Sequence, residues 1–329
     1  MQVTQLPLQM DSLYKCTSWG DDGEQDEPAS VITVQTRRLD RVTLVRRYIS
    51  IKALEEFIGT LDIAKISACN KDLKKLPKKH GTSFVKSYPG KVSGTGVSFS
   101  FFSIKKSPAV AINCTPSKLA DDDWADFLAL LETMFPFGPP QVWKSFRLAK
   151  LEIAMDVKMP LGDLVCVVPK VSAVDSSYLH EGTLYLGQRY GHRSYCIYDK
   201  RKQLADKSGI ELGHNVTRIE VRLRSTGKTL GQLGEFAPPF GNLIVLRKSA
   251  LSKLLDKNPH SNVLKVFVEA VLDGAIAQQV YVDLSPYARK SLLKLLRPVA
   301  LKLNSEAKNW SKWFAEQQIA LESKFLKAC

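Results

Sequence analysis

The sequence lacks a long hydrophobic run, a paired-cysteine motif and an internal repeat. No apolar stretch approaches the ~20 residues that span a bilayer, so we expect no membrane segment. The opening residues, MQVTQLPLQMDSLYK, lack the basic start and apolar core of a secretory signal. The six cysteines are scattered and no C-x-x-C occurs, which argues against a zinc ribbon or a disulfide framework. These features together predict a cytoplasmic protein.

Acidic residues are scarce relative to basic ones. The chain has 47 Lys+Arg and 33 Asp+Glu, a net charge of +14. Residues 1–30 hold six acids and one base, and we expect them to form an acidic disordered tail. The remaining residues hold 46 bases and 27 acids, a net charge of +19. So large a surplus favours a polyanionic partner, most simply nucleic acid, because binding releases counterions.

Strand-like and helical patterns alternate up to about residue 240, and helical patterns dominate beyond it. At 329 residues the chain can bury a large core. We predict an α+β fold with an antiparallel sheet over residues 31–240 and a helical C-terminal region over residues 241–329. The predicted helices of this region are Leu243–Leu255, Asn262–Asp273, Ser285–Leu303 and Ala307–Lys327.

The first half of the chain contains further elements. The pattern predicts strands at Val31–Val34 and Arg41–Ile51 around an Arg-Arg-Leu-Asp turn, and a strand pair at Val97–Ile104 and Ala109–Cys114. Helices are expected at Lys52–Ile63 and Asp121–Phe135. The basic segment Lys71–Lys79 is either a solvated surface loop or a loop that contacts phosphates.

In three segments, apolar and polar side chains alternate as they do in a half-buried strand. The segments are Leu148–Lys158, the end of Thr183–Lys200, and Thr217–Arg224. Glu152 and Asp156 share the polar face of the first segment, and Glu220 lies on the polar face of the third. Tyr198 closes the middle segment. If the three strands are neighbours, three carboxylates and a tyrosine hydroxyl converge on one face of the sheet. A metal-assisted phosphodiester transesterase needs such a set of groups.

The sequence is compatible with a catalytic role and with a structural role for these side chains. The carboxylates could bind Mg²⁺ or Mn²⁺, which prefer oxygen ligands, or they could pair with Lys150, Arg218 and Arg222 on a solvated face. The tyrosine could attack phosphorus with help from a base or nearby cations, or it could pack with its hydroxyl at the surface.

Four motifs in order resemble the Rep_trans family of trans-acting replication initiators, found in rolling-circle plasmids and related filamentous phages. The family carries an L-E-I-A-x-D strand, a T-x-Y-x-G-x-R stretch, an I-Y-[DN]-K stretch and an R-[FIV]-E strand. This sequence matches them with LEIAMD at Leu151–Asp156, TLYLGQR at Thr183–Arg189, IYDK at Ile197–Lys200 and RIE at Arg218–Glu220. The strong match covers about 75 residues, from Leu148 to Arg224.

The resemblance implies a divergent nicking fold with active-site carboxylates and a tyrosine nucleophile. It makes Tyr198 the nucleophile and Glu152, Asp156 and Glu220 the acidic cluster, whose oxygens could bind Mg²⁺ or Mn²⁺. As catalytic partners of the tyrosine, Lys200 could supply positive charge and Glu220 could accept the proton, or Glu220 could equally be a metal ligand. Tyr195 is the weaker candidate because it lies on the opposite face by parity. Nearby basic residues are candidates for DNA contacts: Arg189, Arg193, Arg201, Lys202, Arg218 and Arg222.

The resemblance further implies a bacterial initiator that binds a double-stranded origin, exposes single-stranded DNA and cuts one strand. A 5′-phosphotyrosine would form, and the 3′-hydroxyl would prime a host polymerase. Related initiators recruit a host superfamily 1 helicase and often act as dimers. Two alternatives are a non-catalytic DNA-binding regulator on the same scaffold and a metal nuclease that uses water. The sequence contains no His-hydrophobic-His pair, the metal-binding signature of classical nickases.

Overall fold

The computed structural model describes most of the chain. The described residues are 34–48, 53, 82–83, 90–91, 97–104, 107–135, 138–169, 177–188, 191–301 and 307–327. Several predictions therefore lie outside the described residues: the tail over residues 1–30, the Lys71–Lys79 loop, Arg189, and the Lys52–Ile63 helix except for Ala53.

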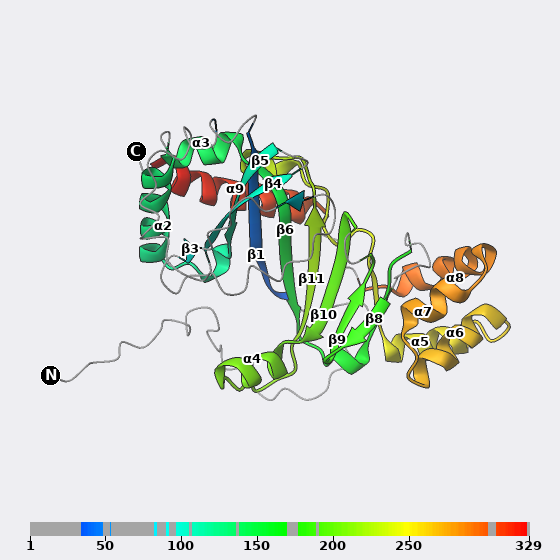
Figure 1. The fold of residues 1–329 in the computed structure, drawn as a ribbon. Coiled ribbons are helices and arrows are strands. Elements are labelled where there is room, and N and C mark those ends of the chain that lie inside the picture. The colour runs from blue at the N-terminus through cyan, green and yellow to red at the C-terminus, as the bar shows by residue number, and fades with distance from the viewer. Residues whose placement is uncertain are drawn as a thin grey trace.

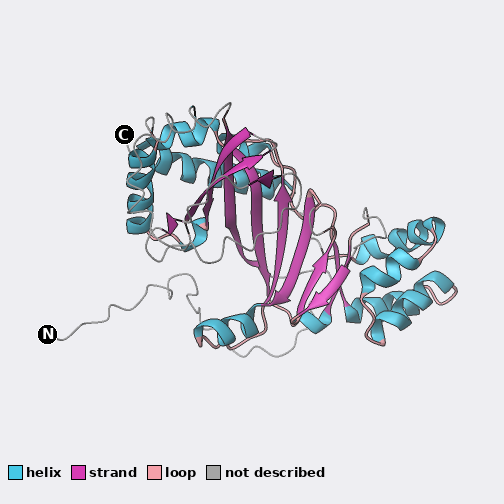
Figure 2. Cartoon of the chain, viewed as in Figure 1, coloured by secondary structure: helices cyan, strands magenta, loops and turns pink. Residues whose placement is uncertain are grey.

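An antiparallel sheet of ten strands forms the centre of the molecule (Figures 1 and 2). The strand order is β2-β4-β5-β1-β6-β11-β10-β9-β8, and β3 pairs with β4. A separate pair joins β7 and β12. The strand bounds are β1 Val34–Arg47, β2 Thr82–Ser83, β3 Gly90–Lys91, β4 Ser98–Ile104, β5 Ser107–Cys114, β6 Arg147–Val157, β7 Leu164–Val167, β8 Ser177–His180, β9 Thr183–Leu186, β10 Arg193–Asp199, β11 Thr217–Arg224 and β12 Ile244–Arg247. The predicted mixture of helices and antiparallel sheet is confirmed.

The helices flank this sheet or follow it in the chain. Their bounds are α2 Asp121–Met134, α3 Gly138–Ser145, α4 Lys200–Ser208, α5 Lys248–Lys257, α6 Asn262–Leu272, α7 Ala277–Asp283, α8 Pro286–Val299 and α9 Ala307–Lys327, with short 3₁₀ turns η2 Pro116–Lys118, η3 Leu161–Asp163 and η4 Leu230–Glu235. The prediction of one helix over Leu243–Leu255 was wrong, because Ile244–Arg247 pairs with β7 before α5 begins. A short apolar run fits a strand and a helix equally well.

Strand β1 differs from the two strands and turn expected in this segment. It runs without interruption over Val34–Arg47, and its register against β6 shifts between Leu39 and Arg41. Asp40 is therefore the extra residue of a β-bulge. A bulge interrupts the alternation of side chains in the same way as a turn, which explains the wrong prediction.

Two hydrophobic clusters stabilise the chain. The larger cluster lies on the apolar face of the ten-stranded sheet and includes Ile153, Ile197 and Val221 together with aromatic residues of α9. Helix α9, red in Figure 1, passes behind β1, and the Arg37 guanidinium lies 4.8 Å from the ring centroid of Trp310. The smaller cluster joins β7 and β12 to α5, α6, α7 and α8. Residues 241–329 thus divide between two cores, and the domain boundary near residue 240 stays a prediction.

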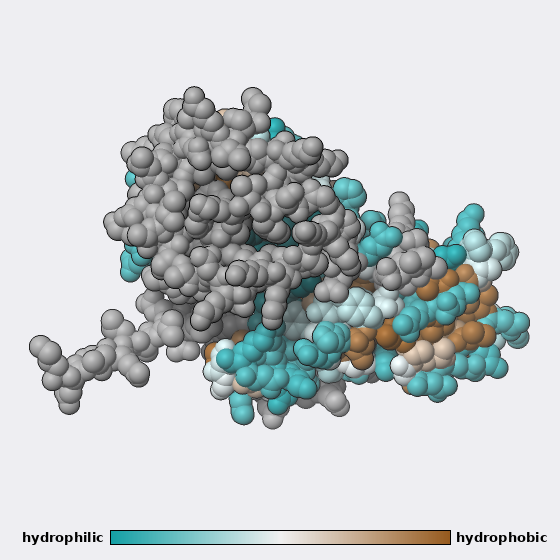
Figure 3. All heavy atoms as spheres, in the orientation of Figure 1, coloured by the Kyte–Doolittle hydropathy of each residue, from teal (hydrophilic) through white to brown (hydrophobic). Residues whose placement is uncertain are grey.

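The surface over α5–α8 mixes hydrophobic and hydrophilic side chains (Figure 3). Val266 and Leu272 of α6 are 55% and 47% exposed. Among the helices in the described residues, none combines the length and the apolar character needed to cross a membrane.

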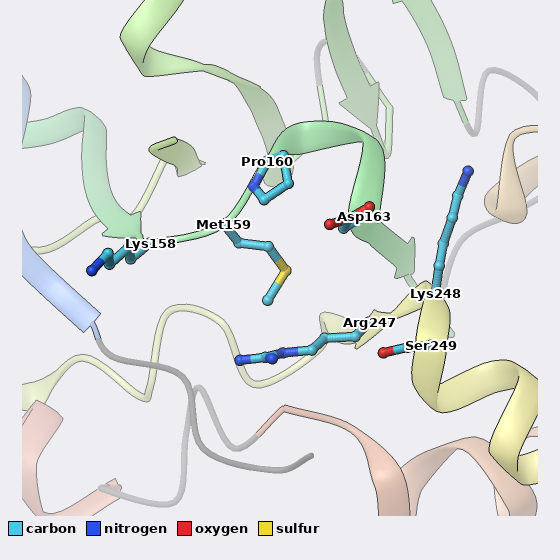
Figure 4. A pocket seen from close by; sticks show the side chains of 7 residues that line it. All are labelled: Lys158, Met159, Pro160, Asp163, Arg247, Lys248 and Ser249. Carbon is cyan, nitrogen blue, oxygen red and sulfur yellow. The ribbon is translucent and has the colours of Figure 1, made fainter. Parts of the chain in front are cut away.

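A polar cavity of about 280 Å³ lies between the segment that follows β6 and the junction of β12 with α5 (Figure 4). Met159 and Pro160 follow β6 on one side. On the other side, Arg247 ends β12 and Lys248 begins α5. The Thr217 hydroxyl donates a 2.7 Å hydrogen bond to the Met159 carbonyl, which ties the end of β6 to β11.

Candidate active site

The strands that carry the predicted site residues are direct neighbours. Strand β11 pairs with β6 on one side and β10 on the other, so the predicted adjacency is confirmed. Arg218 lies opposite both Asp156 and Tyr198 in this register. Because directly opposed residues of an antiparallel pair point to the same face, these side chains project from one face of the sheet. Tyr195 lies on the other face and is buried in the large core.

A short hydrogen bond joins the two predicted catalytic groups Tyr198 and Glu220. The tyrosine hydroxyl donates a hydrogen bond of 2.6 Å to Glu220 Oε1. Burial raises the pKa of Tyr198 above its usual value, and the adjacent carboxylate of Glu220 raises it further. Burial also raises the pKa of Glu220, which favours proton uptake by this carboxylate. The tyrosine therefore needs a proton acceptor in order to react, and Glu220 lies in position to be one.

Asp156 is paired with arginines. Its Oδ1 and Oδ2 accept bonds of 2.6 Å and 2.8 Å from Nε and Nη2 of Arg218, and Arg38 Nη2 donates a third bond of 2.9 Å to Oδ2. The Asp156 and Arg218 side chains are 2% and 4% exposed. Such a bidentate pair fixes both side chains, and both oxygens of the carboxylate already accept charged donors.

Glu152 also lies among cations. It forms ion pairs with Lys150, with Arg222 Nε at 3.1 Å and with Arg41 Nε at 3.7 Å. The open alternative, in which the carboxylates pair with Lys150, Arg218 and Arg222, therefore describes Glu152 and Asp156. The Asp156–Arg218 pair is buried, whereas Lys150 and Arg222 are 25% and 26% exposed beside the buried Glu152.

Asp40 is a site residue that the sequence reasoning missed. The β-bulge in β1 places it at the cleft, with Oδ1 at 3.8 Å from Arg218 Nη1. Its charge raises the pKa values of both Tyr198 and Glu220, as expected for a carboxylate close to them. The one signal in the sequence was a lone acid within the basic run Arg37-Arg38-Leu39-Asp40-Arg41.

The I-Y-D-K motif has a clear local structure. Tyr198 lies near the end of β10, and Asp199 caps α4 by accepting a 2.9 Å bond from the Lys202 backbone NH. The cap fixes the tyrosine at the point where the strand becomes a helix. Lys200 begins α4 and its Nζ donates a 2.7 Å bond to Gln203. Burial, with a contribution from the Arg218 charge, lowers the pKa of Lys200 from 10.5 to about 8.

A polar cleft of about 630 Å³ is lined by Asp40, Glu152, Tyr198, Lys200 and Glu220, whereas Asp156 is not part of its lining. Of the predicted DNA-binding residues, Arg218 and Arg222 line it, whereas Arg201 and Lys202 lie outside it on α4. Arg193 shares the strand face of Tyr195 and points away from the cleft. Other cations in the lining were not predicted: Arg38, Arg41, Lys118 and Lys207.

The predicted ligand set is only partly suited to a divalent ion. In the described segments, no group of three or more His, Cys, Asp and Glu side chains is arranged to hold a metal. Glu152 and Asp156 are occupied by cations. Glu220 and Asp40 have weaker ionic contacts, at 3.5 Å to Arg222 and 3.8 Å to Arg218. Because Mg²⁺ usually takes one or two carboxylates plus phosphate oxygens and water, these two residues fit such an ion better than the predicted set.

Comparison with known proteins gives little further information. No family model and no curated protein matches the chain. Among solved structures, it is similar to a rolling circle replication initiator protein from Geobacillus stearothermophilus, with 12% identity over 67% of this chain and 84% of that one. The TM-score is 0.28, which is a weak likeness.

Proposed function

We propose that this protein is a DNA nicking-and-joining transesterase that initiates rolling-circle replication, with Tyr198 as its nucleophile. The observation that carries the proposal is the 2.6 Å hydrogen bond from Tyr198 to Glu220 inside a cleft lined by basic side chains. A tyrosine bonded to a buried carboxylate, and surrounded by cations that attract phosphate, has what nucleophilic attack on a phosphodiester requires.

Tyr198 Oη attacks phosphorus while its proton passes to Glu220, and the bond from phosphorus to the 3′-oxygen breaks. The 3′-oxygen takes a proton from Lys200, which lines the same cleft. The products are a 5′-phosphotyrosine and a free 3′-hydroxyl that can prime synthesis. Attack of a 3′-hydroxyl on the phosphotyrosine reverses the step and joins the strand.

Cations at the cleft would offset the charge of the phosphate. Arg222 is 26% exposed and Arg38 is 21% exposed, so both are partly accessible to a ligand. Arg218 is almost fully buried and is held by Asp156, so it does not reach into solvent. Its role is to position its neighbours: Arg38 shares the Asp156 carboxylate with it, and Tyr198 lies opposite it in the sheet. Origin DNA, single-stranded DNA, a helicase, a polymerase and a second copy of the chain stay proposed partners on the strength of the resemblance.

A divalent ion, Mg²⁺ or Mn²⁺, belongs to the proposal with a revised ligand set. Glu220 and Asp40 would hold it together with oxygens of the DNA phosphate. The ion would supply Lewis-acid stabilisation of charge on the phosphate. Glu152 and Asp156 would instead hold the arginines in place.

The Asp40→Asn substitution tests this ligand assignment. We expect the Mn²⁺ concentration that gives half-maximal nicking to rise roughly tenfold or more, because the amide has lost the charge that attracts the ion. The measurement is the initial rate of nicking against Mn²⁺ concentration. Asp206→Asn, at an exposed position of α4, is the matched control. An unchanged Mn²⁺ dependence in the Asp40 variant would remove this residue from the ligand set.

The proton donor role of Lys200 predicts a pH dependence. The ammonium must be protonated to act, so the nicking rate should fall about tenfold per pH unit once the pH exceeds about 8. Lys200→Arg keeps the positive charge but does not release its proton at these pH values, so its rate should be low and should lack the decline above pH 8. Rates at constant ionic strength from pH 6 to about 10 test this. A Lys200→Arg protein with the wild-type rate and decline would contradict it.

The experiment that tests the function is incubation with supercoiled DNA carrying the gene of this protein and its flanks, with Mn²⁺ present. Nicked circles with covalently bound protein are the expected product. Nicked circles without bound protein would indicate a nuclease that uses water. Retarded but intact DNA would indicate the non-catalytic regulator.

A further inference from the structure

A second cleft continues from the proposed active site toward the edge of the sheet. It measures about 560 Å³, and its lining includes Tyr178, Tyr185, Arg222 and Arg224. Tyr185 and Arg222 also line the cleft that contains Tyr198. The two hollows therefore share a wall, and a chain bound at Tyr198 can extend along the sheet face into the second one.

The second cleft contains a stacked pair of tyrosines. Tyr178 on β8 lies directly opposite Tyr185 on β9, with ring centroids 4.6 Å apart and planes 9° from parallel. The Arg222 guanidinium lies 5.9 Å from the centroid of the Tyr185 ring. Cys196, opposite Tyr185, and Ser194, opposite Arg222, are small and leave room above β10 for the larger groups. Both tyrosines are partly exposed.

The position of the pair suits the nucleotides next to the scissile phosphate. Tyr185 lies on β9, the strand next to the one that carries Tyr198. It pairs with Cys196, whereas Tyr198 pairs with Thr183, so the two tyrosines are offset by two residues along the strands. Standard strand dimensions put the two residues roughly 8 Å apart across the sheet. Strand β8 ends the order of the described sheet, so no described strand lies beyond Tyr178 to cover the outward side of the pair.

Stacked aromatic rings beside arginines recognise a particular kind of ligand. Single-stranded DNA presents flat bases that stack on aromatic side chains, and a phosphate backbone that follows basic grooves. A base pair inside a duplex has no free face, so this arrangement favours unpaired DNA.

We propose that Tyr178 and Tyr185 form a stacking site for a base of the single-stranded DNA next to the cleavage position, with Arg222 and Arg224 binding its backbone. The inference rests on the proposed function, since it places a substrate strand across the Tyr198 cleft. The base extends the stack on the Tyr178 side, and the arginines lie on the active-site side.

Equilibrium binding of two fluorescent probes to the full chain tests the site. One probe is an oligothymidylate of about ten nucleotides, and the other is an abasic deoxyribose-phosphate strand of the same length. Wild-type protein should bind the oligothymidylate roughly tenfold more tightly, because only that probe can stack. Tyr178→Ala should lose most of this preference, and Tyr178→Phe should keep the wild-type preference. Tyr287→Ala, at a tyrosine of α8 that is 82% exposed, is the matched control and should also keep it.

The outcomes separate this inference from the proposed function. Equal binding of the two probes by wild-type protein, or a full preference in Tyr178→Ala, would overturn the stacking site even if Tyr198 forms a covalent adduct. Conversely, the lack of an adduct would count against the proposed function and would leave the binding result intact. The thermal unfolding temperature of each variant identifies any loss of folding. A Tyr178→Leu protein, which retains an apolar side chain, should lose the preference in the same way as Tyr178→Ala.

Discussion

The Tyr198→Phe protein should form no covalent complex with DNA and should nick at least about a thousandfold more slowly than the wild type. The substitution removes a single oxygen, the one that donates to Glu220 at 2.6 Å, and keeps the ring that packs at the end of β10. Without that oxygen no phosphotyrosine can form. The measurement is the initial rate of nicking of supercoiled DNA, together with recovery of protein bound to the nicked circles.

Tyr195→Phe is the matched control for this experiment. Tyr195 lies three residues earlier on the same strand, and its ring is buried on the opposite face. The same atom is removed from the same residue type, and nicking should stay within a few-fold of the wild type. DNA binding should persist in both variants, because the cations of the cleft are unchanged. Full nicking by Tyr198→Phe would show that another group is the nucleophile.

The Asp156→Asn protein should be less stable by about 3–5 kcal/mol. The substitution removes the negative charge and one of the two acceptor oxygens beside Arg218, whose side chain is 4% exposed, and beside Arg38. A buried guanidinium that loses its counter-charge keeps the cost of desolvation. Denaturant unfolding at neutral pH, followed by circular dichroism, measures the change.

An exposed ion pair provides the comparison. Lys228 and Glu235 are 2.6 Å apart, but their side chains are 30% and 56% exposed. Glu235→Gln should therefore change the stability far less than Asp156→Asn does. A stable Asp156→Asn protein that has lost only its dependence on Mn²⁺ would contradict the structural role and would restore Asp156 as a metal ligand.

Local patterns in the sequence predicted the framework of the site. Alternation in β6, β10 and β11 predicted the polar face, and the parity of Tyr195 and Tyr198 placed the two hydroxyls on opposite sides. These predictions succeeded because each depends only on the two-residue period of a strand. The adjacency of the three strands is a long-range property that no local pattern contains. It was assumed because the proposed chemistry requires the carboxylates and the tyrosine to lie together.

Other parts of the site depend on packing that no local pattern contains. The bulge that directs Asp40 to the cleft is a mismatch between β1 and β6, so it is visible only when both strands are paired. Arg38 reaches Asp156 across 118 positions of sequence. Helix α7 was missed because it has seven residues and includes Val280 and Val282, which favour strands. Whether Glu152 and Asp156 bind a metal or form ion pairs could be decided only from the positions of the arginines around them.

The central claim is that Tyr198 becomes covalently linked to DNA, and mass spectrometry of the adduct tests it most directly. The protein is incubated with supercoiled DNA carrying its own gene and with Mn²⁺, and the nicked product is digested with nuclease and protease. We expect a peptide whose added mass is that of a nucleotide phosphate on Tyr198. A nucleotide on another residue, or nicked DNA with no modified peptide, would contradict it.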